Sequence, residues 1–216
     1  MTRDIRIEQA EIRYEDAVFG GDGGGLAAAE RGLDGVEADL AMARGRLLHA
    51  RFLADRIEDP RELELFERAA ALYRALGDTR GEGEALFWAG TFHQVVRDDP
   101  AAALPALDRA LALATRTGDL LTMSYALRHL GIAAHAAGRL EEARDRLEES
   151  TRLRWELGFL PGVAANLVGL GYLAAQQGRR EDAAGLLAQA ADLAGTAEAH
   201  GVLRQVADAR KDLDLP

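Results

Sequence analysis

Residues 119–159 read DLLTMSYALRHLGIAAHAAGRLEEARDRLEESTRLRWELGF and contain two apolar stripes separated by a glycine. In the first half of the stretch, Leu127 and Leu130 fall at helical spacing and belong to one apolar stripe. A second stripe, which includes Leu147, follows the turn at Gly138. Each stripe needs an apolar cover, so the stretch predicts two helices that pack against each other across a tight turn.

The chain on both sides repeats this unit. The Leu-Gly pair that ends at Gly131 recurs at Gly171, and an Ala-Gly pair ends at Gly90, so the period is about 40 residues. The alanine and leucine of the second helix recur at the same period. Two helices per unit at a fixed period indicate a stacked solenoid, in which neighbouring units complete one another's core.

The repeated pattern resembles a known motif. The residues that carry the resemblance are Leu127-x2-Leu130-Gly131-x2-Ala134 and Ala143-x3-Leu147. They are similar to the tetratricopeptide pattern W-x2-LG-x2-Y…A-x3-F, with leucine and alanine in the aromatic places. Trp155 stands where that pattern has a closing proline. The resemblance covers roughly residues 37–200 and implies an all-α fold, a right-handed superhelical solenoid of helical hairpins.

The period is longer than the usual tetratricopeptide period of about 34 residues. It is closer to the long-helix variety found in the C-terminal sensor regions of large bacterial ATP-dependent LuxR-type regulators. The run at residues 147–194 looks much like those regions. This second resemblance implies a bacterial, regulatory context.

The repeat register predicts one domain for the whole chain. Its parts are a degenerate N-terminal hairpin at 1–36, repeats at 37–78, 79–119, 120–159 and 160–196, and a C-terminal capping helix at 197–213. Near the N-terminus, separate helices are expected at 26–34 and 37–56. The glycine-rich segment 20–25 lacks a preceding strand and a following Gly-Lys-Ser/Thr, so we interpret it as a turn and not as a phosphate loop.

Composition narrows the function classes. The net charge of −10 argues against nucleic-acid binding, which needs clustered Lys and Arg. The chain has no cysteine, and its first residues lack the apolar core of a signal peptide. No stretch has the 18 or so apolar residues of a membrane span. We therefore expect a cytoplasmic protein without disulfides.

The search for catalytic or metal-binding motifs yields no candidate. None of the five histidines has a partner at i+4, and HExxH is absent, so no metal and no cofactor are expected. His49 takes the place of a small repeat residue and is interpreted as a packing residue. Ser124 and Ser150 lie outside G-x-S-x-G. An enzyme is therefore the least favoured class.

The predicted working surface follows from the repeat register. In solenoids of the tetratricopeptide type, the first helix of each unit lines the concave face. Counting from Gly90, Gly131 and Gly171 gives the side chains that point into that groove. The predicted binding residues are Arg46, Glu84, Phe87, Thr91, Gln94, Tyr125, Arg128, Ile132, His135, Val168 and Tyr172.

Aromatic and arginine side chains are common binding hot spots. Arg128 is the favoured anchor, because its guanidinium can pair with a carboxylate or phosphate of a partner. Two competing interpretations stay open. The aromatic residues pack between neighbouring first helices, or Arg128 pairs with Glu84 of the preceding one.

The sequence therefore predicts a binding or scaffold module that captures a peptide or protein segment on the concave face, in a regulatory or biosynthetic context. The alternative is a small-molecule-sensing or accessory protein that uses the same groove, and the third interpretation is an enzyme with its site there. A protein or peptide is the expected partner, with a small molecule or a second copy of the chain as the alternatives. Neither nucleic acid nor a membrane is expected.

Overall fold

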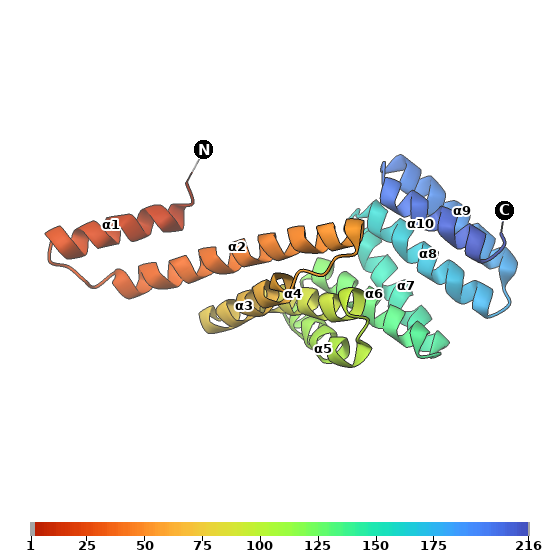
Figure 1. Cartoon of the computed structure of the whole chain (residues 1–216), viewed down its shortest axis with the longest axis horizontal. Helices are drawn as coiled ribbons and strands as arrows, with labels where there is room; N and C mark the ends of the chain where they lie inside the picture. The colour runs from red at the N-terminus through yellow and green to blue at the C-terminus, as the bar shows by residue number, and fades with distance from the viewer. Residues whose placement is uncertain (1–2, 216) are drawn as a thin grey trace. The chain divides into compact units, whose positions relative to one another are not determined.

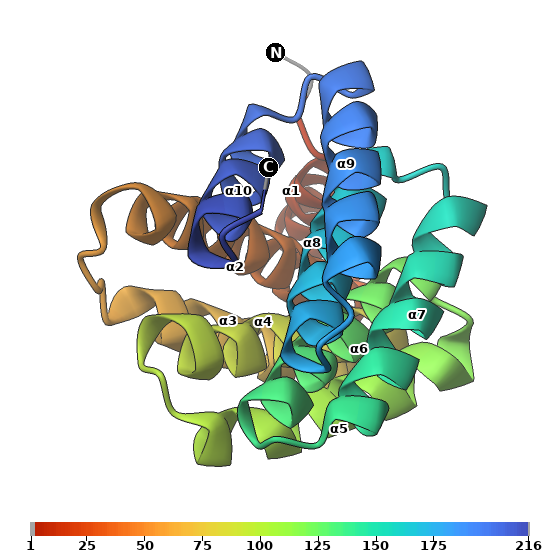
Figure 2. The same ribbon diagram turned by 90° about the vertical axis from the view of Figure 1, so that its right-hand side faces the viewer.

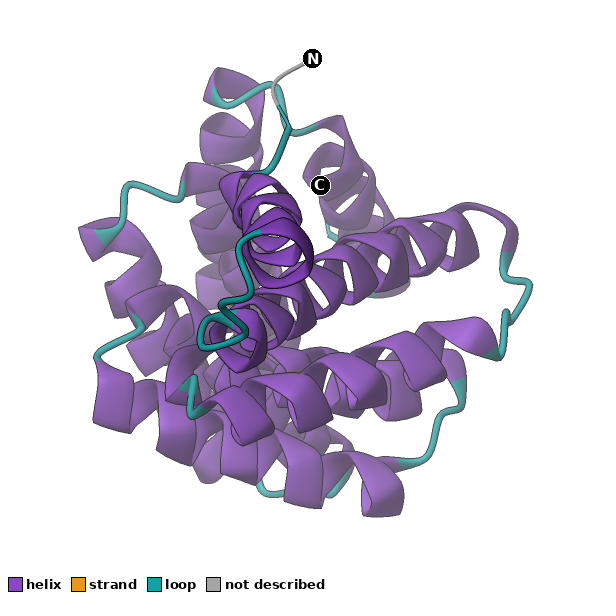
Figure 3. Ribbon diagram, turned by 90° about the vertical axis from the view of Figure 1, so that its left-hand side faces the viewer, coloured by secondary structure: helices purple, strands orange, loops and turns teal. Residues whose placement is uncertain are grey.

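The computed structural model describes residues 3–215, and helices joined by short turns account for most of them (Figures 1 and 3). No strand occurs in that range. The predicted all-α fold of consecutively paired helices is therefore confirmed. The helices gather into two compact units, and the chain passes from the first to the second between Leu113 and Ala114. The interpretation of the whole chain as a single domain stays a prediction.

The first unit is built around one long helix. Its elements are α1 (Ile5–Phe19), α2 (Leu26–Asp55), α3 (Arg61–Leu76), α4 (Thr79–Thr91), the π-helical turn η1 (Phe92–Val96) and most of α5 (Pro100–Thr117). In Figure 1, α1 lies alongside the N-terminal half of α2, and α3 runs along the C-terminal half. No helix within residues 3–215 is both long enough and apolar enough to cross a bilayer.

The structure corrects one expectation for the first unit. The sequence predicts two helices, 26–34 and 37–56, but α2 runs through both without a break. Glycine inside a helix costs only about 1 kcal/mol, which tertiary packing can offset. Here Gly32 and Gly35 lie against Arg6 of α1. Arg6 also forms a 2.7 Å ion pair with Asp39, so the glycines allow α1 to pack closely on α2.

Polar and aromatic side chains fix α2 to α3 and α4. His49 is buried, as its interpretation as a packing residue requires, and its Nδ1 lies 2.8 Å from a carboxylate oxygen of buried Glu62. The ring of Trp88 from α4 stacks on Phe66 and meets the imidazole of His49 edge-on. A Cβ at Gly45 would come within 2.5 Å of Phe66, so this glycine sets the spacing between α2 and α3.

The second unit consists of two helical hairpins and a covering helix (Figure 2). Its helices are α6 (Leu120–Ala136), α7 (Leu140–Glu156), α8 (Leu160–Gln176), α9 (Arg180–Thr196) and α10 (His200–Asp212). The two hairpins, α6–α7 and α8–α9, turn at Gly138 and Gly178, where φ is 74° and 78°. Because only glycine adopts such angles without strain, these residues end the first helices at a fixed point. Val206 of α10 packs on the apolar side of α8 and α9.

The repeated glycine of each first helix leaves space for a leucine of the paired second helix. A Cβ at Gly131 would lie 3.1 Å from Leu147 Cγ and 3.3 Å from the carbonyl oxygen of Ala143. Gly171 stands in the same relation to Leu187, and Gly90 to Leu107. The repeated spacing of the motif therefore has a direct packing cause, the close approach of two helix backbones.

Gly131→Leu should lower the melting temperature of the protein, because the larger side chain must displace Leu147 or separate α6 from α7. Overpacking of this kind typically costs about 1–3 kcal/mol. Gly185→Leu is the matched control, since Gly185 lies within α9, is exposed, and has open space at its Cβ. Thermal unfolding followed by circular dichroism compares the two variants. Equal melting temperatures would contradict the packing role of Gly131.

Candidate functional site

In the second unit, the predicted binding residues lie on two consecutive first helices. They are Tyr125, Arg128, Ile132 and His135 on α6, and Val168 and Tyr172 on α8. The Nη1 atom of Arg128 donates to the carbonyl oxygen of Ala165 at 2.8 Å and to Oδ1 of Asn166 at 2.9 Å. Arg128 thus reaches from α6 to α8, and its side chain is partly buried there.

Further bonds connect the first helices along the unit. His135 Nε2 lies 2.5 Å from Oε1 of Gln176, and the hydroxyl of Tyr172 donates to Oδ2 of Asp212 on α10 at 3.0 Å. Burial and the bond to Asp212 raise the pKa of Tyr172 to about 12. These side chains have a structural role between neighbouring helices, as the competing interpretation of the aromatic positions expects for Tyr172.

Beneath Arg128 lies a buried polar cluster centred on Asn166. Arg154 of α7 is only 2% exposed, and its Nη1 donates to the carbonyl oxygen of Gly162 at 2.8 Å and to Oδ1 of Asn166 at 2.9 Å. The Nδ2 of Asn166 donates to Oγ of Ser150 at 2.8 Å. The side-chain oxygen of Asn166 therefore accepts hydrogen bonds from both guanidiniums, and its nitrogen donates to Ser150 of α7.

The cluster holds two positive charges without a carboxylate. Within residues 3–215, neither Arg128 nor Arg154 forms an ion pair. Burial lowers the pKa of Arg128 to about 10. Burial, together with the neighbouring charge of Arg128, lowers the pKa of Arg154 to about 9. Both guanidiniums remain protonated at neutral pH, so the cluster is electrostatically suited to an anionic group.

Aromatic rings cover part of this charge. The guanidinium carbon of Arg154 lies 5.1 Å from the ring centre of Tyr125 and 5.6 Å from that of Phe159. Such cation–π contacts stabilise a guanidinium where water is excluded. They offset part of the desolvation cost of Arg154 and leave its charge uncompensated.

The sequence interpretation missed Arg154, Asn166 and Ser150 as members of the site. Asn166 was the available signal, since it interrupts the otherwise apolar run of α8. Ser150 occupies a place that holds alanine at Ala110 and Ala190. A polar residue at a packing position requires a polar partner, which the sequence alone does not identify.

In the first unit, the predicted residues Arg46 and Glu84 form an ion pair, and the Arg46 guanidinium lies 5.6 Å from the ring centre of Trp88. Glu84 therefore has a partner within its own unit. Gln94 lies half-buried in η1.

Three predicted positions differ from the expectation of an open surface. Phe87 and Thr91 are each 2% exposed. Val168 is also buried, in the apolar cluster that includes Leu187 and Val206. These residues lie on the first helices as predicted, but their side chains pack against neighbouring residues and do not line an open surface.

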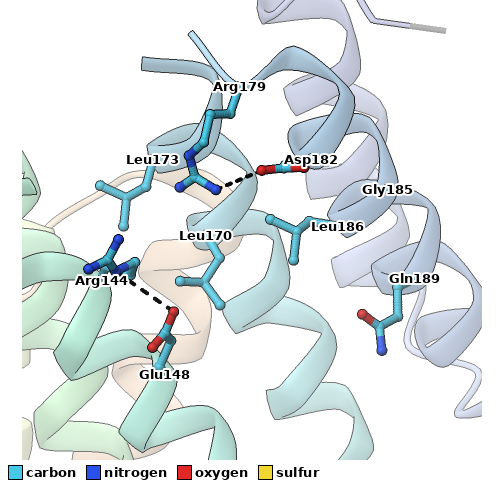
Figure 4. Close-up of a pocket in the computed structure, with 9 residues that line it drawn as sticks. All are labelled: Arg144, Glu148, Leu170, Leu173, Arg179, Asp182, Gly185, Leu186 and Gln189. Carbon is cyan, nitrogen blue, oxygen red and sulfur yellow. Dashed lines mark hydrogen bonds and ion pairs between the residues drawn. The ribbon is translucent and has the colours of Figure 1, made fainter. Parts of the chain in front are cut away.

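A cleft of about 600 Å³ opens elsewhere in the second unit, between α7 and α9 over α8 (Figure 4). Leu170 and Leu186 supply apolar surface. The charges at its edges pair with each other, Arg179 with Asp182 at 2.8 Å and Arg144 with Glu148 at 3.9 Å. The sequence interpretation placed no site residue here. Because its arginines already have carboxylate partners, this cleft lacks the uncompensated charge of the Asn166 cluster.

No group of three or more metal-binding side chains occurs within residues 3–215. A family model for the tetratricopeptide repeat matches residues 84–156, which extend from α4 to the end of α7. No curated protein matches the chain at a significant level. The resemblance to sensor regions of LuxR-type regulators stays a prediction.

Asn166→Ala should destabilise the second unit. The change removes the shared acceptor of two guanidiniums and the donor to Ser150, and each buried polar group left unsatisfied costs about 1–3 kcal/mol. Gln189→Ala is the control, because Gln189 is an exposed helical amide. Urea unfolding measures both variants. A loss no larger for Asn166 than for Gln189 would mean that the cluster contributes nothing to stability.

Proposed function

We propose that this chain, whose residues 84–156 match a family model of the tetratricopeptide repeat, a type that generally serves in protein interaction or as a scaffold, captures a segment of another protein through a carboxylate. The carboxylate pairs with Arg128, on the face formed by the first helices of the second unit. The observation that carries the proposal is the pair of guanidiniums, Arg128 and Arg154, held by uncharged acceptors alone.

The electrostatics favour an acidic segment. The two neighbouring cations repel each other, and a carboxylate that reaches Arg128 relieves this repulsion as well as forming charge-assisted hydrogen bonds. Arg128 is the accessible member of the pair, since its side chain is only partly buried whereas Arg154 is enclosed. Arg154 then acts at a distance, by raising the positive potential under Arg128.

The surroundings of Arg128 suit a peptide. Ile132 lies one turn further along α6 and is 38% exposed, which offers apolar surface beside the charge. His135 follows on the same helix and is half-buried. An acidic side chain followed by an apolar one, at helical or extended spacing, matches this order of groups on α6.

The small-molecule alternative uses the same cluster, because an anionic metabolite also pairs with a guanidinium. Native mass spectrometry of protein purified from its own host separates the two ligand classes. A stoichiometric small anion retained by wild type and lost in Arg128→Ala would favour the sensor. A bound polypeptide would favour the binding module.

The direct test uses short peptides displayed on phage, followed by synthetic copies of the enriched peptides. Each acidic peptide is paired with a copy in which Asp and Glu become Asn and Gln. Loss of a buried charge partner costs about 2–5 kcal/mol, so we expect the amide copies to bind at least about tenfold more weakly. Arg128→Ala should reduce binding of the acidic peptides to the level of their amide copies.

Arg204→Ala is the matched control, since Arg204 is an exposed arginine on α10. It should bind the acidic peptides as wild type does. Circular dichroism must show that the Arg128 variant stays folded. If no peptide is enriched, or if the enriched peptides bind equally well to Arg128→Ala, the proposed site is wrong.

A further inference from the structure

Helix α2 carries an apolar stripe that stays partly exposed in the described chain. Its leucines recur every seventh residue, with Leu26 46%, Leu33 40%, Leu40 47% and Leu47 63% exposed. A seven-residue repeat drifts by only about 20° per heptad, so the leucines follow one gently turning line along the helix. The partly exposed stripe extends over residues 26–50 of α2.

The residues between the leucines complete a coiled-coil pattern. Three positions after each leucine stands a small apolar residue, in the order Ala29, Val36, Ala43 and Ala50. Alternating steps of three and four residues define the a and d positions of a coiled coil. Leucine facing alanine or valine lets two such helices approach closely. Another helix with the same pattern is therefore the natural cover for this stripe.

The charged residues along one edge of the stripe indicate which partner helix fits it. Glu30 and Glu37 follow the first two leucines by four residues, and Arg44 and Arg51 follow the last two. The edge is thus acidic in its N-terminal half and basic in its C-terminal half. A second α2 in the opposite direction places Glu30 against Arg51 and Glu37 against Arg44, around one two-fold axis near Leu40.

A parallel pair gains no such net advantage from charge. Residues five apart then approach each other across the interface, which brings Arg46 near Arg51 of the second copy but also Asp39 near Arg44. Within residues 3–215, Glu30, Arg44 and Arg51 form no ion pair, although the charge of Arg51 also acts on the nearby carboxylate of Asp59. Glu37 is shared, since it already pairs with Arg68 of α3 at 2.7 Å.

The basic half of the edge continues into a groove between α2 and α3. This groove, of about 670 Å³, is lined by Leu47, Leu48 and Leu65 and by arginines that include Arg44, Arg51 and Arg68. Its leucines and its excess of arginine are complementary to the leucines and glutamates in the N-terminal half of α2 of a second copy. The opposite edge of α2 is occupied by α1, where Arg6 pairs with Asp39 (Figure 1).

We infer that two copies of this chain associate through antiparallel pairing of their α2 helices. The contact is isologous, so every attractive pair occurs twice and the interface closes on itself. This association is independent of the carboxylate site at Arg128, which lies in the other unit.

Sedimentation equilibrium of the full chain should report a dimer. Leu40→Glu should abolish it and leave the monomer folded, because Leu40 is exposed. Leu53→Glu is the matched control on the same helix, since Leu53 is 50% exposed but lies off the heptad line. A monomeric wild-type chain at tens of micromolar would overturn the inference, and so would a Leu40→Glu variant that remains dimeric.

Charge reversal tests the direction of pairing. Glu30→Arg and Arg51→Glu should each raise the dimer dissociation constant by about tenfold or more, and the double variant should restore it, because it exchanges the two partners. The chain has no cysteine, so Leu40→Cys and Leu26→Cys give clean cross-linking with a short bismaleimide. Antiparallel pairing predicts cross-linking at residue 40 alone. Equal cross-linking at both residues, or no rescue by the double variant, would overturn the antiparallel arrangement.

Discussion

A close approach between each first helix and its paired second helix sets the packing within the helical hairpins. Gly131 leaves room for Leu147, and the same relation recurs between Gly171 and Leu187. Each glycine leaves space for one leucine of the facing helix, and alanines fill much of the remaining core.

This constraint explains which features could be predicted from sequence. Helix pairs and their turns follow from positions that recur at a fixed period, because each recurrence reports the same local packing. Helix α2 was misread at Gly35, since a glycine that accommodates a neighbouring helix looks like one that ends a helix. The buried cluster was missed for another reason. Arg154 and Asn166 meet only when α7 lies beside α8, and no spacing rule expresses that contact.

The predicted binding residues illustrate a related difficulty. A position on a first helix is identified by periodicity, but periodicity does not distinguish a groove from a seam between helices. Val168 proved to be buried, whereas Ile132 on α6, the preceding first helix, is exposed. Arg128 combines both properties, because its guanidinium bonds to α8 while part of its side chain remains accessible. Periodicity thus assigns residues to helices, and tertiary contacts decide which of their side chains are exposed.

An opposite charge would have different effects at the Asn166 cluster and at the arginines of α2. At the cluster around Asn166, desolvation of two cations opposes folding, and replacement by apolar residues would often be neutral or stabilising. The buried charge of Arg154 lies close to the accessible Arg128, so the two together produce a positive potential that attracts an anionic partner. On α2, Arg44 and Arg51 are solvated, so their charges cost little in the monomer and a screened pair adds little affinity. There the leucines supply the driving force and the charges set the direction of pairing, which is how charged edges act in coiled coils.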